Sequence, residues 1–499
     1  MVMAKSGRIG FDNEKYKKLQ SEKIRERIET FGGKLYLEFG GKLYDDYHAS
    51  RVLPGFEPDS KMKMLLELKD QTEIIVVINS GDIEKNKKRS DIGITYDADV
   101  LRLIDVFRHF GLCVGSVVMT VFEHQPAAIS FQKKLESLGV RVYRHYPIAG
   151  YPSNVEKIVS EDGYGKNDFV ETEKPLVVVT APGPGSGKMA VCLSQVYNEL
   201  KRGVRAGYAK FETFPVWNLP LRHPVNIAYE AATTDLADVN MIDPFHLEAY
   251  GKTTVNYNRD VEIFPVLSAI FEKIYGTCPY KSPTDMGVNM AGFCITDDET
   301  VREAANQEII RRYYGALRSI RDGNAPPDLI YKHELQMKQA GLSTADRPVV
   351  AAALAKAKET GAPATALQLA DGRIITGKTS NLLGATSACL VNALKALAGI
   401  DDSLHLLSPN VITPIQHLKI EHLGNHNPRL HTDEVLIALS VCGVSSPEAE
   451  RAVDMLDRLH GCDCHSTVIL SQVDENLLRK IGINLTTEPV YQTKKLYHK

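Results

Sequence analysis

The chain has 499 residues, of which 43% are hydrophobic and 24% are charged, and its formal net charge at pH 7 is −3. This length and composition are enough for two to four packed domains. The near balance of positive and negative residues gives no support for a nucleic-acid-binding protein or for one that binds an anionic membrane surface.

The N-terminal segment and the cysteines indicate a cytoplasmic protein. Residues 1–18 are polar and contain no apolar stretch of the kind that a secretory signal requires. The longest apolar runs, such as Ile74–Ile78, have the length of strands and are too short to cross a membrane. The 8 cysteines are dispersed along the chain, which is typical of reduced thiols.

The first predicted elements are a charged helix over residues 16–30 and two short strands. The phrase Phe31–Tyr36 recurs as Phe39–Tyr44, and each copy contains a pair of glycines. Glycine pairs beside short alternating apolar segments favour two strands joined by tight turns.

A parallel sheet is predicted from residue 73 onwards, because apolar runs without alternation are separated by helical patterns. The strands are expected at 73–78, 113–120, 141–146 and 175–180, and helices at 98–110 and 126–138. The fold class is therefore α/β and multi-domain, with a mostly parallel sheet and helices on both of its faces in the N-terminal part.

Residues 203–290 have weak periodicity and are expected to cover the carboxyl ends of the strands, where ligands of open α/β sheets bind. A strong amphipathic helix is predicted over 298–321, and the segment 322–327 breaks it.

The C-terminal part again alternates strands and helices. A hairpin is expected over 364–376 and a buried strand over 466–470, with helices at 383–397, 433–439 and 447–458. We divide the chain into an N-terminal α/β domain (1–297), a helical segment (298–360) and a smaller C-terminal α/β domain (361–499).

The clearest functional signal directly follows the strand at 175–180. The loop Pro182–Lys188 is rich in glycine and leads into a helix over 190–200. Glycines allow consecutive backbone N–H groups to point into one concavity, and the helix N-terminus adds partial positive charge. We expect the phosphates of ATP to bind here, with Lys188 reaching the β- and γ-phosphates. The cofactor-binding residues are Gly183, Gly185, Ser186, Gly187 and Lys188.

The loop departs from the phosphate-loop pattern at two positions. Pro182 stands where the first glycine is expected, and Met189 stands where a serine or threonine normally binds Mg²⁺. The metal must therefore be held by other residues or not be held at all. A glycine-rich turn with a solvated lysine is the alternative interpretation of this segment.

Three aspartates are candidates for binding Mg²⁺ or for acting as a base. Asp82 follows the first parallel strand and is our candidate metal ligand. Asp235 and Asp238 come after the glycine-rich loop, and their spacing would place both on one face of a helix. We predict that they are catalytic together with Lys188. Turn residues and helix N-terminal acids have the same sequence appearance.

A second lysine follows a predicted strand in the segment Gly377–Ser380. Ser380 or Asn381 is expected to cap the helix over 383–397, and an anion site at the start of that helix is the alternative.

Histidines and cysteines gather near the C-terminus, where thiolates and imidazoles together would suit Zn²⁺. They are His417, His422, His426, His431, His460, His465, Cys462 and Cys464. A single Cys-x-Cys without a second pair is a weak metal signal, so a metal-dependent hydrolase remains an alternative hypothesis.

The whole chain resembles a family of bacterial proteins of similar length that is catalogued only as a domain of unknown function. The resemblance rests on residues 180–189, on 465–471 and on the phrases at 256–265 and 281–289, and it covers essentially all of the chain. It implies an α/β N-terminal part that carries the phosphate-loop-like segment, a helical middle and a smaller α/β C-terminal domain. It implies no activity.

The leading hypothesis is an ATP-dependent kinase-like or ligase-like enzyme that uses Mg²⁺ and acts on a small-molecule substrate. The second is a protein that binds a nucleotide or phosphometabolite without catalysis, which Met189 favours. A homo-oligomer is expected from base rates alone.

Overall fold

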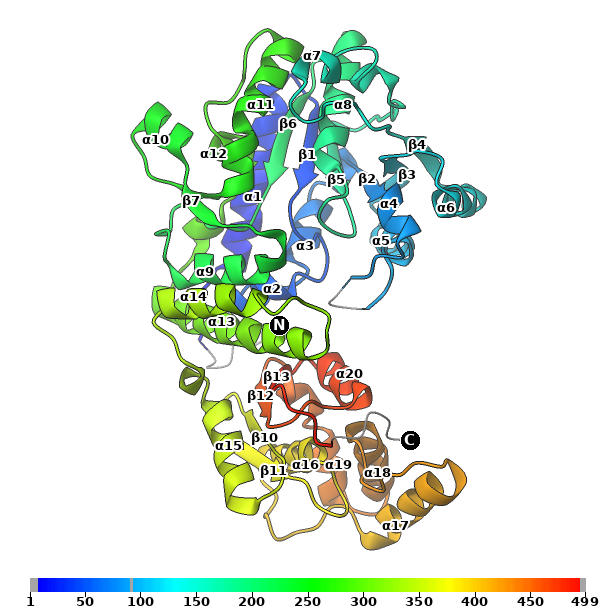
Figure 1. Ribbon diagram of the computed structural model, residues 1–499, viewed down its shortest axis with the longest axis vertical. Coiled ribbons are helices and arrows are strands. Elements are labelled where there is room, and N and C mark those ends of the chain that lie inside the picture. The colour runs from blue at the N-terminus through cyan, green and yellow to red at the C-terminus, as the bar shows by residue number, and fades with distance from the viewer. Residues whose placement is uncertain (1–7, 90–92, 494–499) are drawn as a thin grey trace.

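The computed structural model describes residues 8–89 and 93–493, so the first residues of the polar N-terminal segment lie outside it. In these two ranges no helix is both long and apolar enough to span a bilayer. The described chain forms a larger N-terminal body and a smaller C-terminal body, stacked along the long axis of the molecule (Figure 1).

The N-terminal body is built on a seven-stranded sheet in the order β4-β3-β2-β5-β1-β6-β9, and every pairing in it is parallel. Its strands are β1 (Leu35–Phe39), β2 (Thr72–Asn79), β3 (Cys113–Thr120), β4 (Arg141–Arg144), β5 (Leu176–Thr180), β6 (Gly207–Phe211) and β9 (Gly287–Val288). All five residues of β5 and of β6 are buried, as expected for strands covered on both faces. The α/β fold class is confirmed.

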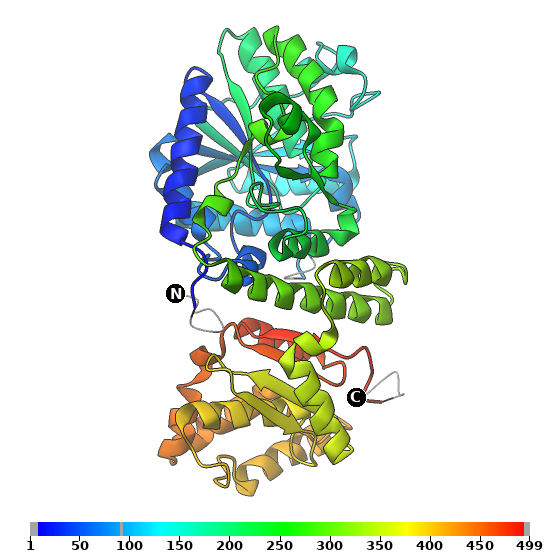
Figure 2. The same cartoon turned by 90° about the vertical axis from the view of Figure 1, so that its left-hand side faces the viewer.

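Helices cover both faces of this sheet, and α1 and α11 lie on opposite faces (Figure 2). The helices of this body are α1 (Asn13–Thr30), α2 (Tyr47–Val52), α3 (Ser60–Leu66), α4 (Ser80–Glu84), α5 (Tyr96–His109), α6 (Pro126–Ser137), α7 (Val155–Ile158), α8 (Lys188–Lys201), α9 (Pro224–Ala232), α10 (Pro244–Tyr250), α11 (Asn258–Tyr275) and α12 (Pro283–Met286). The helices predicted before β3 and β4 and after β5 are all present.

The strand order places β5 at a point where the chain changes direction. From β2 the chain runs to β3 on one side, whereas from β5 it runs through α8 to β6 on the other side, beyond β1. Ligands of open α/β sheets bind in the crevice at such a switch point, outside the carboxyl ends of the strands. The glycine-rich loop leaves β5 at this crevice.

Two local predictions were wrong. The first copy of the repeated phrase ends in the first two residues of β1, whereas the second copy contributes only Phe39 to that strand and then forms a loop. Gly40 packs against the carbonyl of Phe211 in β6, where a Cβ atom would lie 2.6 Å from that oxygen, and the chain then turns into α2. Residues 203–290 were expected only to cover the carboxyl ends of the strands. They also contribute β6 and β9 to the sheet, and they form a small antiparallel pair, β7 (Asn240–Ile242) with β8 (Val255–Tyr257).

Two long helices lie between the two bodies (Figure 1). Helix α13 (Asp298–Arg321) has the predicted bounds, and α14 (Leu329–Gln339) packs against it. Helix α13 also contacts α2 and α9 of the N-terminal body and β13 of the C-terminal body. It therefore forms a wall that both bodies share.

The C-terminal body has a four-stranded sheet in the order β11-β10-β12-β13. Its strands are β10 (Ala364–Gln368), β11 (Ile374–Lys378), β12 (Asp463–Ser466) and β13 (Asn484–Thr487). The predicted hairpin is confirmed as the antiparallel pair β10–β11, and β12 pairs in parallel with β13. The strand predicted at 466–470 lies instead at Asp463–Ser466, and the chain leaves the sheet after Ser466.

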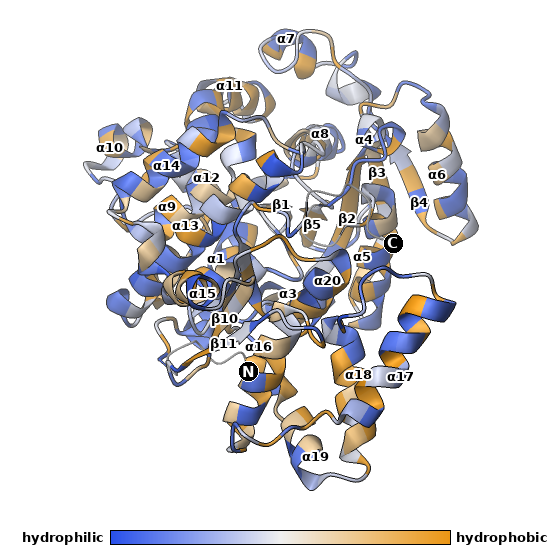
Figure 3. Ribbon diagram, turned by 60° about the horizontal axis from the view of Figure 1, so that its bottom comes forward, coloured by the Kyte–Doolittle hydropathy of each residue, from blue (hydrophilic) through white to orange (hydrophobic). Residues whose placement is uncertain are grey.

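Helices surround this smaller sheet: α15 (Pro348–Thr360), α16 (Ala385–Ala398), α17 (Pro409–His417), α18 (Thr432–Gly443), α19 (Pro447–Val453) and α20 (Gln472–Lys480). Hydrophobic and hydrophilic residues alternate as stripes on α17 and α18 (Figure 3). The buried residues of this body, among them Leu390, Leu394 and Leu439, form a core separate from that of the N-terminal sheet.

Candidate functional site

The glycine-rich loop joins the buried strand β5 to helix α8 without an intervening element. Gly185 has φ +76° and Gly187 has φ +87°, a left-handed conformation that glycine adopts at little cost. Gly187 is the N-cap residue of α8, and no side chain caps this helix end. The two glycines therefore turn the chain sharply into the helix, and Lys188 becomes its first residue.

The carbonyl groups of this loop accept hydrogen bonds from neighbouring side chains. Ser186 Oγ donates to the carbonyl of Gly183 at 2.7 Å, and Thr120 Oγ1 at the end of β3 donates to the carbonyl of Ser186 at 2.7 Å. Asn79 Nδ2 at the end of β2 donates to the carbonyl of Gly185 at 3.4 Å. Neighbouring strand ends thus hold the loop through its carbonyl groups.

The amide groups of the loop are not used in this way. Within the described chain, the N–H groups of Gly183 and of residues 185–190 donate to no protein acceptor, and the first N–H to do so is that of Val191, which donates to the carbonyl of Gly187 at 3.0 Å. A helix leaves its first four N–H groups without intrahelical partners, and side chains, water or ligands normally satisfy them. The loop is therefore a set of hydrogen-bond donors next to a helix N-terminus.

Lys188 adds a cation to these donors. Its ammonium group forms no hydrogen bond or ion pair with any residue that the structure describes. Burial lowers the pKa of Lys188, the carboxylate of Glu38 opposes this change, and Lys210 adds to it. A partly buried ammonium group without a direct counter-ion is stabilised by a bound anion.

Glu38 lies near the end of β1, the strand next to β5. Its Oε2 accepts a hydrogen bond from the hydroxyl of Tyr208 at 2.7 Å. The carboxylate of Glu38 therefore lines the same cavity as the glycine-rich loop.

A buried polar network follows at the end of β6. The ammonium group of Lys210 pairs with Glu212 Oε1 at 2.9 Å and also contacts Asp260 and the hydroxyl of Tyr257. The hydroxyl of Tyr257 donates to Glu212 Oε1 at 3.2 Å. Burial raises the pKa of Glu212 to about 7, although Lys210 opposes this shift. A carboxylate with such a pKa can act as a general base near neutral pH.

The loop 180–190, Glu38 and the network of Lys210, Glu212, Tyr257 and Asp260 all line one cavity of about 2260 Å³ between the two bodies. Its walls come from the loop 180–190, from the strand ends at Glu38 and Lys210, from α2 and α13, and from the C-terminal segments around Asp463 and Asn484. Typical small-ligand pockets measure roughly 300–1,000 Å³. The cavity has room for a nucleotide and a second ligand.

The structure separates the three aspartates that the sequence suggested. Asp82 does not line the cavity, and its carboxylate pairs with Lys87 at 3.3 Å. Asp235 and Asp238 line the cavity, but the chain turns through a left-handed residue, Ala237, between them. The prediction that both lie on one helix face was therefore wrong.

Of these two, Asp235 is exposed and Asp238 is buried. Asp238 Oδ2 accepts a hydrogen bond from Arg259 Nη2 at 2.8 Å. Across residues 8–89 and 93–493, no three His, Cys, Asp or Glu side chains are grouped so that they could hold a metal ion.

The histidines and cysteines of the C-terminal part do not converge. His431 Nδ1 contacts Asp474 at 3.0 Å, whereas His465 Nδ1 contacts Thr486 Oγ1 at 2.9 Å. Cys464 is buried, and burial raises the pKa of its thiol to about 12.

The segment Gly377–Ser380 does not cap a helix either. Helix α16 starts at Ala385 with Gly384 as its N-cap residue. Ser380 Oγ instead accepts hydrogen bonds from the N–H groups of Leu382 and Leu383, at 3.2 and 3.1 Å. The capping prediction was wrong because a local turn separates β11 from α16.

Comparison with known proteins places the whole chain in one family. The family model described as "Domain of unknown function DUF1846, N-terminal" matches residues 9–341, and its C-terminal counterpart matches residues 345–497. The chain belongs to the DUF1846 family.

Curated relatives of this DUF1846 chain match over nearly their full length. UPF0371 protein cu0538 of Corynebacterium urealyticum is 60% identical, over 98% of this chain and 99% of the relative. A UPF0371 protein of Streptococcus thermophilus is 58% identical, and UPF0371 protein SpyM50764 of Streptococcus pyogenes is 57% identical, with the same coverage.

Sequence reasoning on this DUF1846 chain missed Glu38, Lys210 and Glu212. Each is a charged residue at the end of an otherwise apolar strand, in the segments Leu35–Phe39 and Gly207–Thr213. A charged side chain at the carboxyl end of a buried strand was the available signal, because such a residue faces the ligand edge of the sheet.

Proposed function

We propose that this protein binds the phosphates of ATP at the loop 183–189 and acts as a kinase-like or ligase-like enzyme on a small molecule. The observation that carries the proposal is the run of backbone N–H groups without a protein acceptor beside the unpaired ammonium group of Lys188. Donors in this arrangement suit the oxygens of a polyphosphate.

Each part of the site has a role in this proposal. The amides of Gly183, Gly185, Ser186 and Gly187 bind phosphate oxygens. Lys188 neutralises the negative charge on the group that is transferred. Glu212 accepts the proton of the attacking substrate, because its raised pKa suits a base at neutral pH. In this proposal Glu212 takes the role first assigned to Asp235 and Asp238, because its pKa is raised to about 7.

The residues at the loop fit Mg²⁺ through one carboxylate. Met189 offers no hydroxyl, and Asp82 does not line the cavity, so Glu38 on the neighbouring strand is the residue that would hold the ion. Mg²⁺ is commonly held by one or two carboxylates together with substrate phosphates. When bound, it neutralises charge on the phosphates.

The proposal predicts that Lys188→Ala removes at least about half of the stabilisation of the protein by ATP. A ligand at 100 times its Kd stabilises a protein by about 2.7 kcal/mol, which raises the melting temperature by several degrees. Losing the lysine should weaken ATP binding by roughly tenfold or more, since hydrogen bonds to charged groups contribute about 1.5–3 kcal/mol. Thermal melting with and without ATP and Mg²⁺ measures this.

Lys378→Ala is the matched control, because Lys378 also follows a glycine at a strand end but does not line the cavity. An ATP-dependent melting shift that is the same in Lys188→Ala and in the unchanged protein would refute the proposal.

A binding protein without catalysis is the second candidate, and Met189 in place of the usual hydroxyl favours it. Incubation with ATP and a panel of small hydroxyl, amine and carboxylate compounds separates the two. Release of ADP or AMP with one of them indicates an enzyme, whereas binding without turnover across the panel indicates a sensor.

A further inference from the structure

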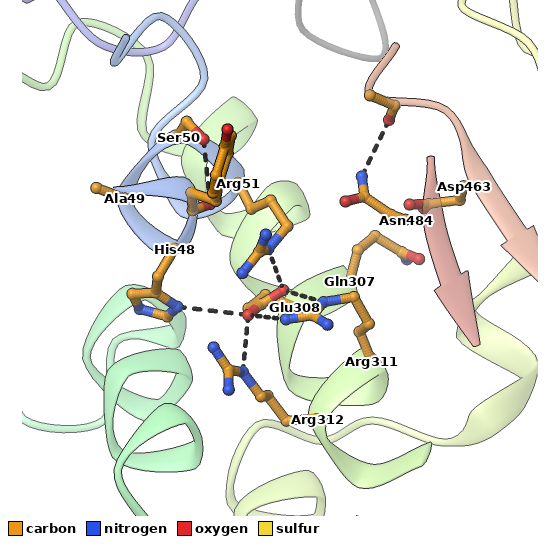
Figure 4. Close-up of polar contacts among 12 residues, drawn as sticks. His48, Ala49, Ser50, Arg51, Gln307, Glu308, Arg311, Arg312, Asp463 and Asn484 are labelled. Carbon is orange, nitrogen blue, oxygen red and sulfur yellow. Dashed lines mark hydrogen bonds and ion pairs between the residues drawn. The ribbon is translucent and has the colours of Figure 1, made fainter. Parts of the chain in front are cut away.

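Three arginines surround one buried glutamate (Figure 4), and all four residues line the cavity. Glu308 on α13 pairs with Arg311 Nε at 2.6 Å, with Arg312 Nε at 2.8 Å and with Arg51 Nε of α2 at 3.0 Å. Three guanidinium groups and one carboxylate give this cluster a net formal charge of +2. The cluster therefore carries more positive charge than its own carboxylate neutralises.

The hydrogen bonds leave two of the arginines with free donor groups. Arg311 donates to Glu308 through both Nε and Nη2, whereas Arg51 and Arg312 donate through Nε alone. Among the described residues, no protein group accepts a hydrogen bond from the Nη atoms of Arg51 or Arg312. Their side chains retain 24% and 28% exposure, and both line the cavity. Two planar donor groups thus remain available at the cavity surface.

The pKa shifts of the cluster agree with an excess of positive charge around Glu308. Burial and the neighbouring Arg311 lower the pKa of Arg51 to about 10. Burial alone would raise the pKa of Glu308, but the three arginines hold it well below its usual range. His48 also contacts Glu308, at 3.4 Å, and burial lowers the pKa of this histidine, so it adds no charge near neutral pH. An anion would relieve the repulsion between the arginines.

The position of the cluster connects it to the proposed reaction centre. The ring of His48 packs on Phe214 with centroids 5.2 Å apart, and Phe214 stacks on Tyr229 at 5.5 Å. Phe214 lies two residues after Glu212, and all of these side chains line the cavity. An aromatic surface therefore extends from the arginines to the buried base.

We propose that Arg51 and Arg312 bind an anionic group, phosphate or carboxylate, of the small-molecule substrate. Arginine forks suit both groups because they donate two parallel hydrogen bonds. Arg311 then neutralises Glu308, and the substrate extends over Phe214 and Tyr229 toward Glu212. The identification of this anion with the substrate rests on the proposed function, but the anion site itself does not.

The test uses the full-length Lys188→Ala protein, so that the glycine-rich loop contributes least to anion binding. Inorganic phosphate is titrated while the melting temperature is followed, and succinate replaces phosphate in a parallel titration. We expect stabilisation by at least one of the two anions. Adding Arg312→Gln should raise the anion concentration needed by roughly tenfold, the value of a charge-assisted hydrogen bond pair.

Arg302→Gln in the same background is the matched control, because Arg302 lies on α13 but pairs with Asp298 outside the cavity. Arg51→Gln, on a different helix, should reproduce the loss, and either variant leaves Glu308 with two arginines. The anion that stabilises the protein at the lower concentration identifies the substrate group as phosphate or carboxylate.

Stabilisation by neither anion, or stabilisation that Arg312→Gln and Arg51→Gln leave unchanged, would overturn the arginine site. An ATP-dependent melting shift that Lys188→Ala leaves unchanged would instead refute the proposed function and leave the arginine site intact.

Discussion

Two segments of the chain place a glycine and a lysine at the end of a strand, and they use their backbone in opposite ways. Around Gly187 and Lys188 the carbonyl groups are bonded and the amides have no protein acceptor in the described ranges. Around Gly377 and Lys378 the next amides are bonded internally: Thr379 N–H donates to the carbonyl of Pro363 at 2.8 Å and Ser380 N–H to that of Leu383 at 3.0 Å.

The difference comes from the surroundings of the two strands. Strand β5 is a central parallel strand, so its loop opens at the carboxyl edge of the sheet and leads directly into a helix. Strand β11 is the edge strand of an antiparallel hairpin, and Gly377 packs against the backbone of α16. A glycine and a lysine indicate an anion site only where the amides beside them lack partners.

In the proposed function the base is Glu212, which lines the same cavity as the segment around Gly187 and Lys188, and its removal should have the largest effect. Glu212→Gln should reduce ATP turnover by roughly 10²–10⁴-fold, the usual contribution of a general base. Only the ionised carboxylate accepts a proton, so the rate in the unchanged enzyme should rise with pH through about 7 and level off above it. The measurement is kcat against pH with a substrate from the panel; a rate that is insensitive to pH between 6 and 8 would exclude Glu212 as the base.

Substitution in the segment around Gly377 and Lys378 should affect the stability of the protein and not its binding of ATP. An alanine Cβ at Gly377 would lie 2.1 Å from the backbone nitrogen of Cys389, so the helix must shift. Gly377→Ala should lower the free energy of unfolding by about 3 kcal/mol, as overpacking against a fixed backbone does. Chemical denaturation measures the loss, and ATP affinity of the folded protein should not change. A large loss of affinity would show that the two segments are not independent.

The corresponding substitution in the segment around Gly187 and Lys188 should affect the binding of ATP more than the stability of the protein. Gly187→Ala forces a side chain into a left-handed conformation with its Cβ 3.1 Å from Thr120. The strain is about 1–2 kcal/mol, and a backbone that relaxes it turns the amides away from their present direction. Calorimetric titration should show ATP affinity reduced by roughly tenfold. Unchanged affinity would mean that the amides at residues 187–189 do not bind phosphate.

Helices and strands could be predicted from the sequence where a strong pattern of apolar residues lies within the element itself. The continuous apolar runs of β2, β3 and β5 and the amphipathic pattern of α13 predicted these elements closely. The second copy of the repeated phrase failed because tight packing of Gly40 against β6, and not its own pattern, decides its conformation.

The site itself was only partly accessible. The glycine-rich loop is local and was recognised, but Glu38 becomes its neighbour only because β1 lies between β5 and β6 in the sheet. Arg51 and Arg312 meet on Glu308 from helices far apart in the chain. The i, i+4 spacing of Glu308 and Arg312 on α13 predicts their pairing, but sequence spacing carries no information on the positions of Glu38 and Arg51.

The central claim is that free amides of the loop bind phosphate, and a crystal structure of the protein with a non-hydrolysable ATP analogue and Mg²⁺ tests it most directly. The account predicts phosphate oxygens about 2.7–3.2 Å from the backbone nitrogens between residues 185 and 189, with the ammonium group of Lys188 on the same phosphates. Analogue density elsewhere in the cavity, with these amides bound only to water, would contradict it.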